Sequence, residues 1–316
     1  DDMQANPAEA ETAAALKVLL EGGASMVFLT GHGERDYEKS TDSQYRNSFN
    51  NEVYRASMIQ KGFHLSKVNL ATQEIPASTS VLVIADPVTP YSAAELSKIS
   101  AYIANGGNAI LLGEDAHRDA IQPVADLVGI QFEAGTFTQN NKGFEPNQIQ
   151  ADFSKDATKV SIWLQENIEK LKKISMPTAM GVSQNSSAGY QVNPLLVVNS
   201  ENTNVVVDSI SKSANAAVGV TLSKKSLTKE QRIMVFGDAD FLNNVEHGRQ
   251  LDGVGENSSI GGRIFSWLTN NEYPIATDRA RPLDNTLLLD ENGKLMTKII
   301  LVMVLPLILL IIGARL

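Results

Sequence analysis

The sequence predicts an α/β fold with a doubly wound, mostly parallel sheet, followed by a C-terminal transmembrane helix. Short apolar runs such as VLVIA at residues 81–85 contain no polar side chain, which is typical of parallel strands buried on both faces. In the first half of the chain these runs alternate with segments of helical periodicity, and that alternation indicates a parallel sheet. Near the C-terminus, residues 299–312 form an apolar run without a charge.

The elements of the first half follow one another in a regular order. Ser92 and Glu95 form the S-x-x-E pattern of a capping box, and Gly106-Gly107 closes the helix that this box begins. We expect strands at residues 26–30, 64–70, 81–85, 109–112 and 130–133, and helices at residues 8–20, 50–61, 92–105 and 118–128.

The second half is less regular. Residues 135–151 are rich in Asn, Gln, Thr and Gly, which predicts an excursion loop over the sheet. The strands after this loop resemble a sheet meander more than βαβ units. We expect helices at residues 160–172 and 259–268, and strands at residues 174–182, 194–198, 205–207, 216–222 and 232–236.

Four parts are predicted along the chain. Residues 1–21 form an N-terminal helix, and residues 22–270 form the α/β domain, with a sub-boundary near residues 135–160. Residues 271–296, with their Pro, Asp, Asn and Arg, form a stalk. Residues 297–316 form the transmembrane helix.

The charge-free run at residues 299–312 has two interpretations. It is shorter than the roughly 20 residues that cross ~30 Å of hydrocarbon, so a buried helix is the alternative. However, the run is apolar on every face, whereas a surface helix of a globular domain has a single apolar stripe. Pro306 within the run is also tolerated more readily in a membrane helix than in a soluble one. These features favour a membrane helix.

The composition argues against several classes of function. The chain has 27 basic and 36 acidic residues, a net charge of -9 and no Lys/Arg-rich block, so we expect no surface for nucleic acid. It has no cysteine, which excludes disulfides, thiolate nucleophiles and Cys-ligated zinc. The turn Gly31–Glu34 lacks the further Gly spacing and the basic residue of a P-loop, and we expect no cofactor.

Polar residues follow several of the predicted strands at their carboxyl ends. Because parallel strands end at the same edge of a sheet, we expect these side chains to line one crevice for a ligand or partner. The alternative for each acidic residue is that it caps the helix that follows and complements the dipole of that helix. The candidate residues are Gly31, His32, Gly33, Glu34, Asp86, Glu114, Asp115, Asp238, Asp240 and Asn244.

An enzyme is the less favoured interpretation of this crevice. A nucleophile elbow would place Ser or Cys between a strand and a helix, but the turn Gly113–Asp115 contains neither. No H-E-x-x-H or similarly tight spacing of metal ligands is present. We therefore predict no catalytic residue and no metal ligand. A metal-dependent hydrolase would have to use His32, Glu34, His117, Asp238 and Asp240.

Five segments, taken in their order and spacing, are more specific than any single motif. They are FLTGHGERD at residues 28–36, the block IPAS…LGED at residues 75–115, RIMVFGDADFLNN at residues 232–244, Trp267-Leu268 and Leu305-Pro306. Together they resemble the GldG-type gliding-motility auxiliary proteins of ABC transporters, also called ABC-type uncharacterised transport system proteins.

That resemblance implies a flavodoxin-like, class I glutamine-amidotransferase-like fold without the catalytic cysteine, and a membrane helix at each end of an extracytoplasmic domain. Residues 1–21 would then lead from a membrane helix that precedes residue 1. The implied protein is a non-catalytic accessory or substrate-capturing subunit in the inner (cytoplasmic) membrane, with its main domain on the periplasmic side. It would dock to an ABC-2-type permease and, through it, to a cytoplasmic ATPase. The alternative is a carbohydrate-processing or metal-dependent hydrolase on the same fold.

Overall fold

The chain divides into two compact units, Asp1–Thr277 and Asp278–Leu316. In the second unit, helix α8 (Glu291–Ile299) is followed by a π-helical turn at Ile300–Val304. The computed structural model describes residues 9–54, 57–162, 164–186, 188–208, 210–225, 230–249, 257–273, 291–304, 306–307 and 313.

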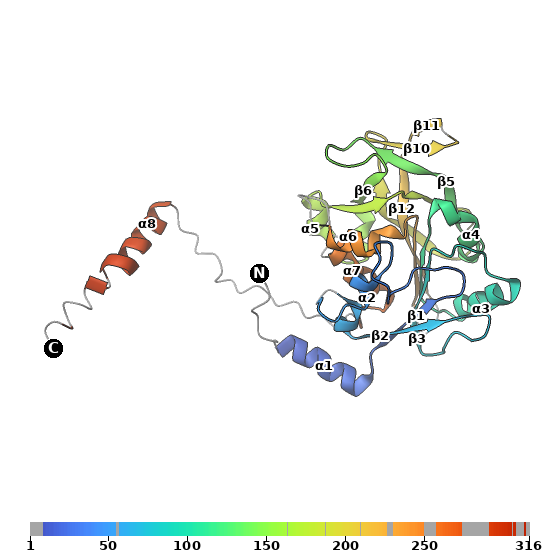
Figure 1. The fold of residues 1–316 in the computed structure, drawn as a ribbon, viewed down its shortest axis with the longest axis horizontal. Helices are drawn as coiled ribbons and strands as arrows, with labels where there is room; N and C mark the ends of the chain where they lie inside the picture. Colours follow the sequence, from blue (N-terminus) through green and yellow to red (C-terminus); the bar gives the residue numbers. More distant parts are fainter. Residues whose placement is uncertain are drawn as a thin grey trace. The chain divides into compact units, whose positions relative to one another are not determined.

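The first unit is built on a nine-stranded sheet with the order β2-β1-β3-β4-β13-β12-β9-β6-β7 (Figure 1). The first five strands of this order are parallel to one another, and from β13 to β7 each neighbouring pair is antiparallel. The parallel strands are β1 (Ala24–Leu29), β2 (Phe63–Val68), β3 (Thr79–Ala85), β4 (Ala109–Leu112) and β13 (Glu230–Phe236). The antiparallel strands are β6 (Gln148–Phe153), β7 (Lys173–Pro177), β9 (Gln191–Val198) and β12 (Ala216–Lys225).

A second, smaller sheet is entirely antiparallel and has the order β11-β10-β5-β8. The long strand β5 changes register against β8 between Phe132 and Thr136. Gly135 lies at this irregularity with φ +90°, and a Cβ there would lie 2.3 Å from the Val206 carbonyl oxygen, so only glycine fits. The four strands are β5 (Ile130–Gln139), β8 (Met180–Gln184), β10 (Thr203–Val207) and β11 (Ile210–Ser213).

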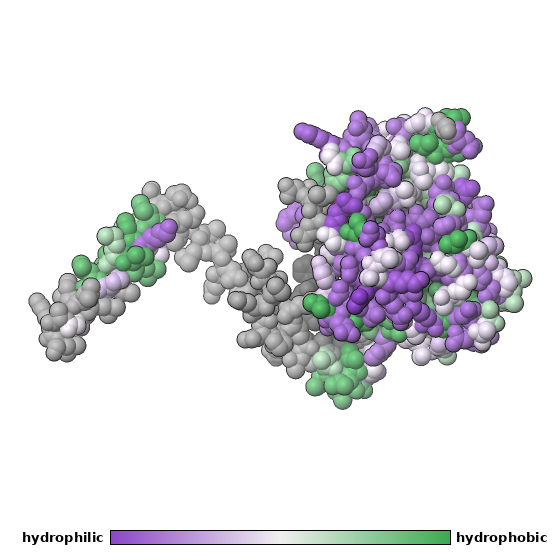
Figure 2. Space-filling model, in the orientation of Figure 1, coloured by the Kyte–Doolittle hydropathy of each residue, from purple (hydrophilic) through white to green (hydrophobic). Residues whose placement is uncertain are grey.

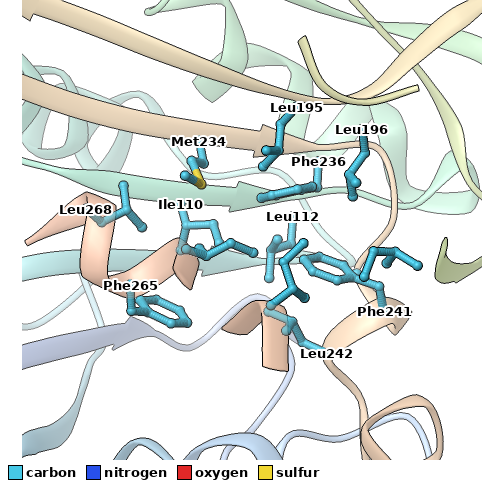
Figure 3. Close-up of a cluster of buried hydrophobic side chains, with 14 of the residues drawn as sticks. Ile110, Leu112, Leu195, Leu196, Met234, Phe236, Phe241, Leu242, Phe265 and Leu268 are labelled. Atoms are coloured by element: carbon cyan, nitrogen blue, oxygen red, sulfur yellow. The ribbon is translucent and has the colours of Figure 1, made fainter. Parts of the chain in front are cut away.

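Helices cover both faces of the parallel strands. On one face, Ile99 of α3 and Val124 of α4 join a buried cluster with Leu111 of β4. On the other face, Phe265 and Leu268 of α7 belong to a cluster that also contains Ile110, Leu112 and Phe236, as Figure 3 shows. Successive residues of β4 therefore face opposite helices, which explains why this strand is apolar throughout. The helices of the first unit are α1 (Glu9–Glu21), α2 (Arg46–Phe49), α3 (Ala93–Ala104), α4 (Arg118–Asp126), α5 (Leu164–Glu169), α6 (Asn244–Gly248) and α7 (Asn257–Leu268), with 3-10 turns η2 (Met58–Lys61), η3 (Asp115–His117), η4 (Lys155–Lys159) and η5 (Asp240–Leu242).

Several large apolar side chains are exposed on the first unit, and two groups of them lie close together in the chain (Figure 2). Leu16, Leu19 and Leu20 lie on α1, and Val207 and Ile210 flank the turn between β10 and β11. The rest of the face seen in Figure 2 is largely hydrophilic over this unit.

The predicted doubly wound, mostly parallel, flavodoxin-like sheet is wrong. The prediction holds for the five parallel strands, but the large sheet continues through four antiparallel strands and a second antiparallel sheet is present. The connection between the paired strands β10 and β11 is too short to contain a crossover helix. Residues 135–151, predicted as a loop, contain the end of β5 and the start of β6. In the second half of the chain, the apolar runs identified strands but did not reveal that their neighbours are antiparallel.

Over the residues that it describes, the structure also contradicts the predicted C-terminal transmembrane helix. Among the described residues, no helix is both long enough and apolar enough to cross a membrane. The α-helix that the structure shows in this region, α8, contains Lys294 and Lys298 and gives way to the π-helical turn after Ile299. Residues 305 and 308–312 of the apolar run, and residues 274–290 of the predicted stalk, lie outside the described residues.

Two local predictions had opposite outcomes. The capping box at Ser92 and Glu95 is confirmed at the start of α3, because each side chain accepts a hydrogen bond from the backbone of the other. The helix predicted at residues 50–61 is wrong, since the described residues of this range form only the 3-10 turn Met58–Lys61. Asn51 Oδ1 accepts the Val53 N–H at 3.0 Å, and this local bond offers the backbone an alternative to a helix.

Candidate functional site

Four neighbouring parallel strands, β1, β3, β4 and β13, bring the loops at their carboxyl ends together at one edge of the large sheet. Arg35, in the loop after β1, lies at the centre of this edge. Its side chain contacts acidic residues from each of the other three loops. We call these five residues, Arg35, Asp86, Glu114, Asp238 and Asp240, the Arg35 cluster.

Arg35 joins the loops by direct ion pairs. Its Nε and Nη2 atoms each lie 2.9 Å from Asp86 Oδ2, and its Nη1 lies 3.1 Å from Asp240 Oδ1. Nη1 also donates to the Ser43 carbonyl oxygen at 2.7 Å, while Nη2 lies 3.8 Å from Glu114 Oε1. Because the Arg35 side chain is only 12% exposed, these pairs are largely shielded from water.

Glu114, after β4, is buried and holds the loop after β13. Its Oε1 accepts the N–H groups of Ala239 at 2.7 Å and Asp240 at 3.2 Å, and the Thr178 hydroxyl donates to Oε2 at 3.1 Å. Burial, together with the negative charges of Asp240 and Asp86, raises the pKa of Glu114 to about 8. The protonated form of Glu114 is therefore favoured at neutral pH.

Asp238 is fully buried at the end of β13. Its Oδ1 accepts the Phe241 N–H at 2.6 Å, but its Oδ2 has no hydrogen-bond partner among the described residues. Burial and then the charges of Glu114 and Asp240 raise the pKa of Asp238 well above its ordinary value. An ionised Asp238 would be a buried charge without a counterion in contact, so its neutral form is favoured as well.

Asp86 links Arg35 to His117, which belongs to η3. His117 Nδ1 lies 2.8 Å from Asp86 Oδ1, so the two carboxylate oxygens face different cations or donors. Asp86 has a left-handed backbone with φ 53°, a conformation that Asp adopts more readily than most residues. Its N–H donates to the Leu112 carbonyl oxygen at 2.8 Å, which fixes it beside the end of β4.

His32 and Glu34 form a second cluster with the start of α3. His32 Nε2 lies 3.0 Å from Glu95 Oε1, and Glu34 accepts the backbone N–H of His32 at 2.7 Å and the Tyr91 hydroxyl at 2.9 Å. The hydrogen bonds from His32 and then from Ser92 lower the pKa of Glu95 to about 2. These contacts fasten the loop after β1 to the loop after β3.

The two glycines of the same loop are required by its backbone. Gly31 has φ +119° and Gly33 has φ +83°, both in the region that favours glycine. A Cβ at Gly33 would lie 2.9 Å from Val88 Cγ2, and one at Gly31 would lie 3.0 Å from the Asn69 side chain. The GHGE segment is therefore shaped to pack closely against its neighbours.

Two candidate residues lie outside both clusters. Asp115 Oδ1 accepts the Gly135 N–H of β5 at 3.0 Å and so joins the two sheets. Asn244 begins α6 and donates to the carbonyl oxygens of Lys39 and Thr41 at 3.1 Å and 2.7 Å, while its Oδ1 accepts the Asn47 N–H at 2.7 Å. Asn244 thus orders the segment after Arg35 without touching the Arg35 cluster.

Sequence reasoning missed Arg35 itself. The prediction of converging acidic residues was made from strand ends, and it considered no counterion for them. The signal was present in FLTGHGERD, where Arg35 is the one basic residue of a segment that follows a buried strand. A buried acidic cluster requires a nearby cation or protons, and this requirement could have directed attention to Arg35.

A small pocket lies at the same edge. Its volume is about 220 Å³, and Val88, Pro90 and residues 115–120 line it, including His117. Sites for whole small molecules usually have volumes of roughly 300–1,000 Å³, so this pocket is below their usual size. Within the described part of the chain, no group of three or more His, Asp or Glu side chains is placed to hold a metal ion.

One known protein family matches the first part of the chain. Residues 25–142 match the family described as an ABC-type uncharacterized transport system. The match supports an auxiliary component of an ABC-type transport system. It contains β1 to β4, α3, α4 and the Arg35, Asp86 and Glu114 members of the cluster.

Solved structures support the fold. The N-terminal domain of mmIFT52 superposes with a TM-score of 0.54 at 17% sequence identity, over 77% of this chain and 97% of that domain. At this identity the likeness concerns the fold alone. No curated protein matches the chain.

Proposed function

We propose that this protein is a non-catalytic accessory subunit of an ABC transporter of the gliding-motility type. The family match of residues 25–142 supports a role in an ABC-type transport system. The observation that carries the non-catalytic part of the proposal is the Arg35 cluster, because Arg35 already pairs with Asp86, Glu114 and Asp240.

The position of the cluster strengthens this argument. In the parallel part of the sheet, β2 lies on one side of β1 while β3 and β4 lie on the other, so the order reverses between β1 and β3. Ligands of open α/β sheets usually bind at such a reversal, beyond the carboxyl ends of the strands. Here the Arg35–Asp86 and His32–Glu95 contacts fill that position. The loops are thus held together by contacts with one another, which suits a docking role.

The proposed partner is an ABC-2-type permease, which would connect the subunit to a cytoplasmic ATPase. We further propose that the first unit acts on the extracytoplasmic side of the inner membrane. The test is affinity purification of the full-length protein from its own host in mild detergent, with quantitative mass spectrometry. We expect a permease and an ATPase to co-purify in similar amounts, and the absence of both would contradict the proposal. Protease protection in intact and in opened cells would test the location.

One observation favours a hydrolase as the second candidate. His117 is oriented by the buried Asp86 carboxylate and lines the small pocket, and a general base is commonly oriented in this way. The discriminating experiment is an assay of the purified protein against glycoside and amide substrates, with and without added divalent metal. We expect no turnover. Turnover by the wild-type protein that is lost in His117→Ala would favour a hydrolase over the accessory subunit.

A further inference from the structure

The Arg35 cluster contains more acidic groups than its cation can neutralise. Asp86, Glu114 and Asp238 are each at most 7% exposed, and Asp240 lies beside them. Arg35 supplies one positive charge and makes its closest contacts with Asp86. Burial of a carboxylate without a counterion costs several kcal/mol per ion, so some of these groups must hold a proton in the folded protein.

The contacts identify Glu114 and Asp238 as the groups that hold protons. Glu114 lies 3.8 Å from Arg35, beyond hydrogen-bond distance, and Asp238 Oδ2 has no hydrogen-bond partner among the described residues. The Thr178 hydroxyl, 3.1 Å from Glu114 Oε2, can accept from a carboxylic acid as well as donate to a carboxylate. The site therefore accommodates Glu114 in either protonation state, whereas Asp238 has no surface to solvent.

The segment from Arg35 to Tyr45 lies beside these groups through its two ends, Arg35 near Glu114 and Tyr45 against Ala239, and we call it the covering segment. At one end, the Arg35 N–H donates to the Ala85 carbonyl oxygen at 2.9 Å. At the other end, the Tyr45 hydroxyl donates to the Ala239 carbonyl oxygen at 2.7 Å. The Tyr45 N–H donates to the Asp36 carbonyl oxygen at 3.1 Å. Asp238 has no exposed surface and Glu114 is only 7% exposed, so full solvation of either carboxyl group requires this segment or the loop after β13 to move.

We propose that the Arg35 cluster is a proton-dependent clasp, in which protonated Glu114 and Asp238 keep the covering segment closed and release of their protons to water loosens it. Two added negative charges would repel Asp86 and Asp240 and would require solvation, which only an opened segment provides. The clasp is a property of this chain alone and does not depend on the transport role. Charged and titratable groups face the clasp from every loop packed against it: Arg35 and Tyr45 after β1, Asp86 after β3, His117 in η3, Asp240 after β13 and Glu246 in α6.

Amide chemical shifts offer a direct test on the wild-type protein. The N–H groups of Ala239 and Asp240 donate to Glu114 Oε1, so their shifts report the charge of that carboxyl group. Between pH 5.5 and 9.5 we expect both amides to titrate with a midpoint near 8, the raised pKa of Glu114. No titration of these amides in this range would show that Glu114 does not change charge as proposed and would overturn the clasp.

Hydrogen exchange then tests whether the covering segment moves. Exchange of the Tyr45 amide, corrected for the intrinsic effect of pH, should accelerate more than tenfold from pH 6 to pH 9. In Glu114→Gln, which keeps a neutral side chain of the same shape, most of this acceleration should disappear. The matched control is Asp115→Asn, which neutralises the adjacent carboxyl group that binds Gly135 outside the cluster, and it should behave as the wild type does. Equal pH dependence in all three proteins would also overturn the proposal.

Discussion

The parallel and antiparallel regions of the protein hold their buried polar groups in different ways. At the edge of the parallel strands, charged side chains from four loops meet around Arg35. On the antiparallel strands the buried polar side chains are neutral amides and hydroxyls. Gln139 of β5 accepts the Gln150 N–H of β6 at 2.8 Å, and Asn257 accepts the Ser175 N–H of β7 and donates to the Ser175 carbonyl oxygen.

The difference follows from topology. Parallel strands all end at the same edge, so loops that are distant in sequence converge there, and their polar ends must neutralise one another. Neighbouring antiparallel strands end at opposite edges, so fewer loops meet, and a single amide can satisfy the backbone of the adjacent strand. The comparison leads us to expect that the parallel edge contributes pH-dependent stability and the antiparallel region pH-independent stability.

Removal of Arg35 should have the largest effect. In Arg35→Met, Asp86 and Asp240 lose their shared cation in a buried setting, and the free energy of unfolding should fall by about 3–5 kcal/mol. Urea denaturation measures this change. The control Lys170→Met removes a cation from an exposed pair with Glu166 and should cost less than about 1 kcal/mol. Similar losses in the two variants would refute the distinction between the cluster and the surface pairs.

Removal of a buried amide should have the next largest effect. Asn257→Leu leaves the backbone N–H and carbonyl of Ser175 and the carbonyl oxygen of Phe241 without this partner, and should cost about 2–3 kcal/mol. Because no charge is involved, the loss should be the same at pH 5 and pH 8. A loss that differs between pH 5 and pH 8 would contradict the expected contrast between the two regions.

The pH dependence of the free energy of unfolding should reveal the contribution of protonated Glu114. Its pKa in the folded protein is about 8, above the ordinary value of 4.5, so the unfolded chain releases this proton first as pH rises. The stability from protonated Glu114 is complete below about pH 4.5 and is lost as pH rises through about 8. Relative to Glu114→Gln, the wild type should lose about 1–3 kcal/mol between pH 5 and pH 8 in urea denaturation. A constant difference between the two proteins would contradict this expectation.

The smallest expected effect concerns the close packing of the loop after β1. Gly33 and Gly143 both have positive φ, but a Cβ would clash with Val88 only at Gly33, while Gly143 has open space around it. Gly33→Ala should therefore cost about 1 kcal/mol more than Gly143→Ala, because both share the backbone strain and only the first adds the clash. Thermal melts of the two variants can resolve this difference.

Part of the fold could be predicted from local sequence. Residues 81–85 and 109–112 lie within buried parallel strands, because a short run with no polar side chain must be covered on both faces. Ser92 and Glu95 form the predicted capping box, since that pattern is satisfied within a single helical turn. The acidic residues after these strands also reach one edge as expected, apart from Asp115, which turns to β5.

The remaining features depend on contacts between distant residues. Strand direction from β5 onward depends on short connections such as the one between the paired strands β10 and β11, and hydrophobic periodicity carries no signal for it. The apolar run after Lys298 predicted a membrane helix, yet the described helices are too short and too polar for that. Arg35 gains its central place only when β1, β3, β4 and β13 become neighbours. Local sequence thus determined where strands and caps form, whereas tertiary structure decided strand direction and charge pairing, because both require groups far apart in the chain to meet.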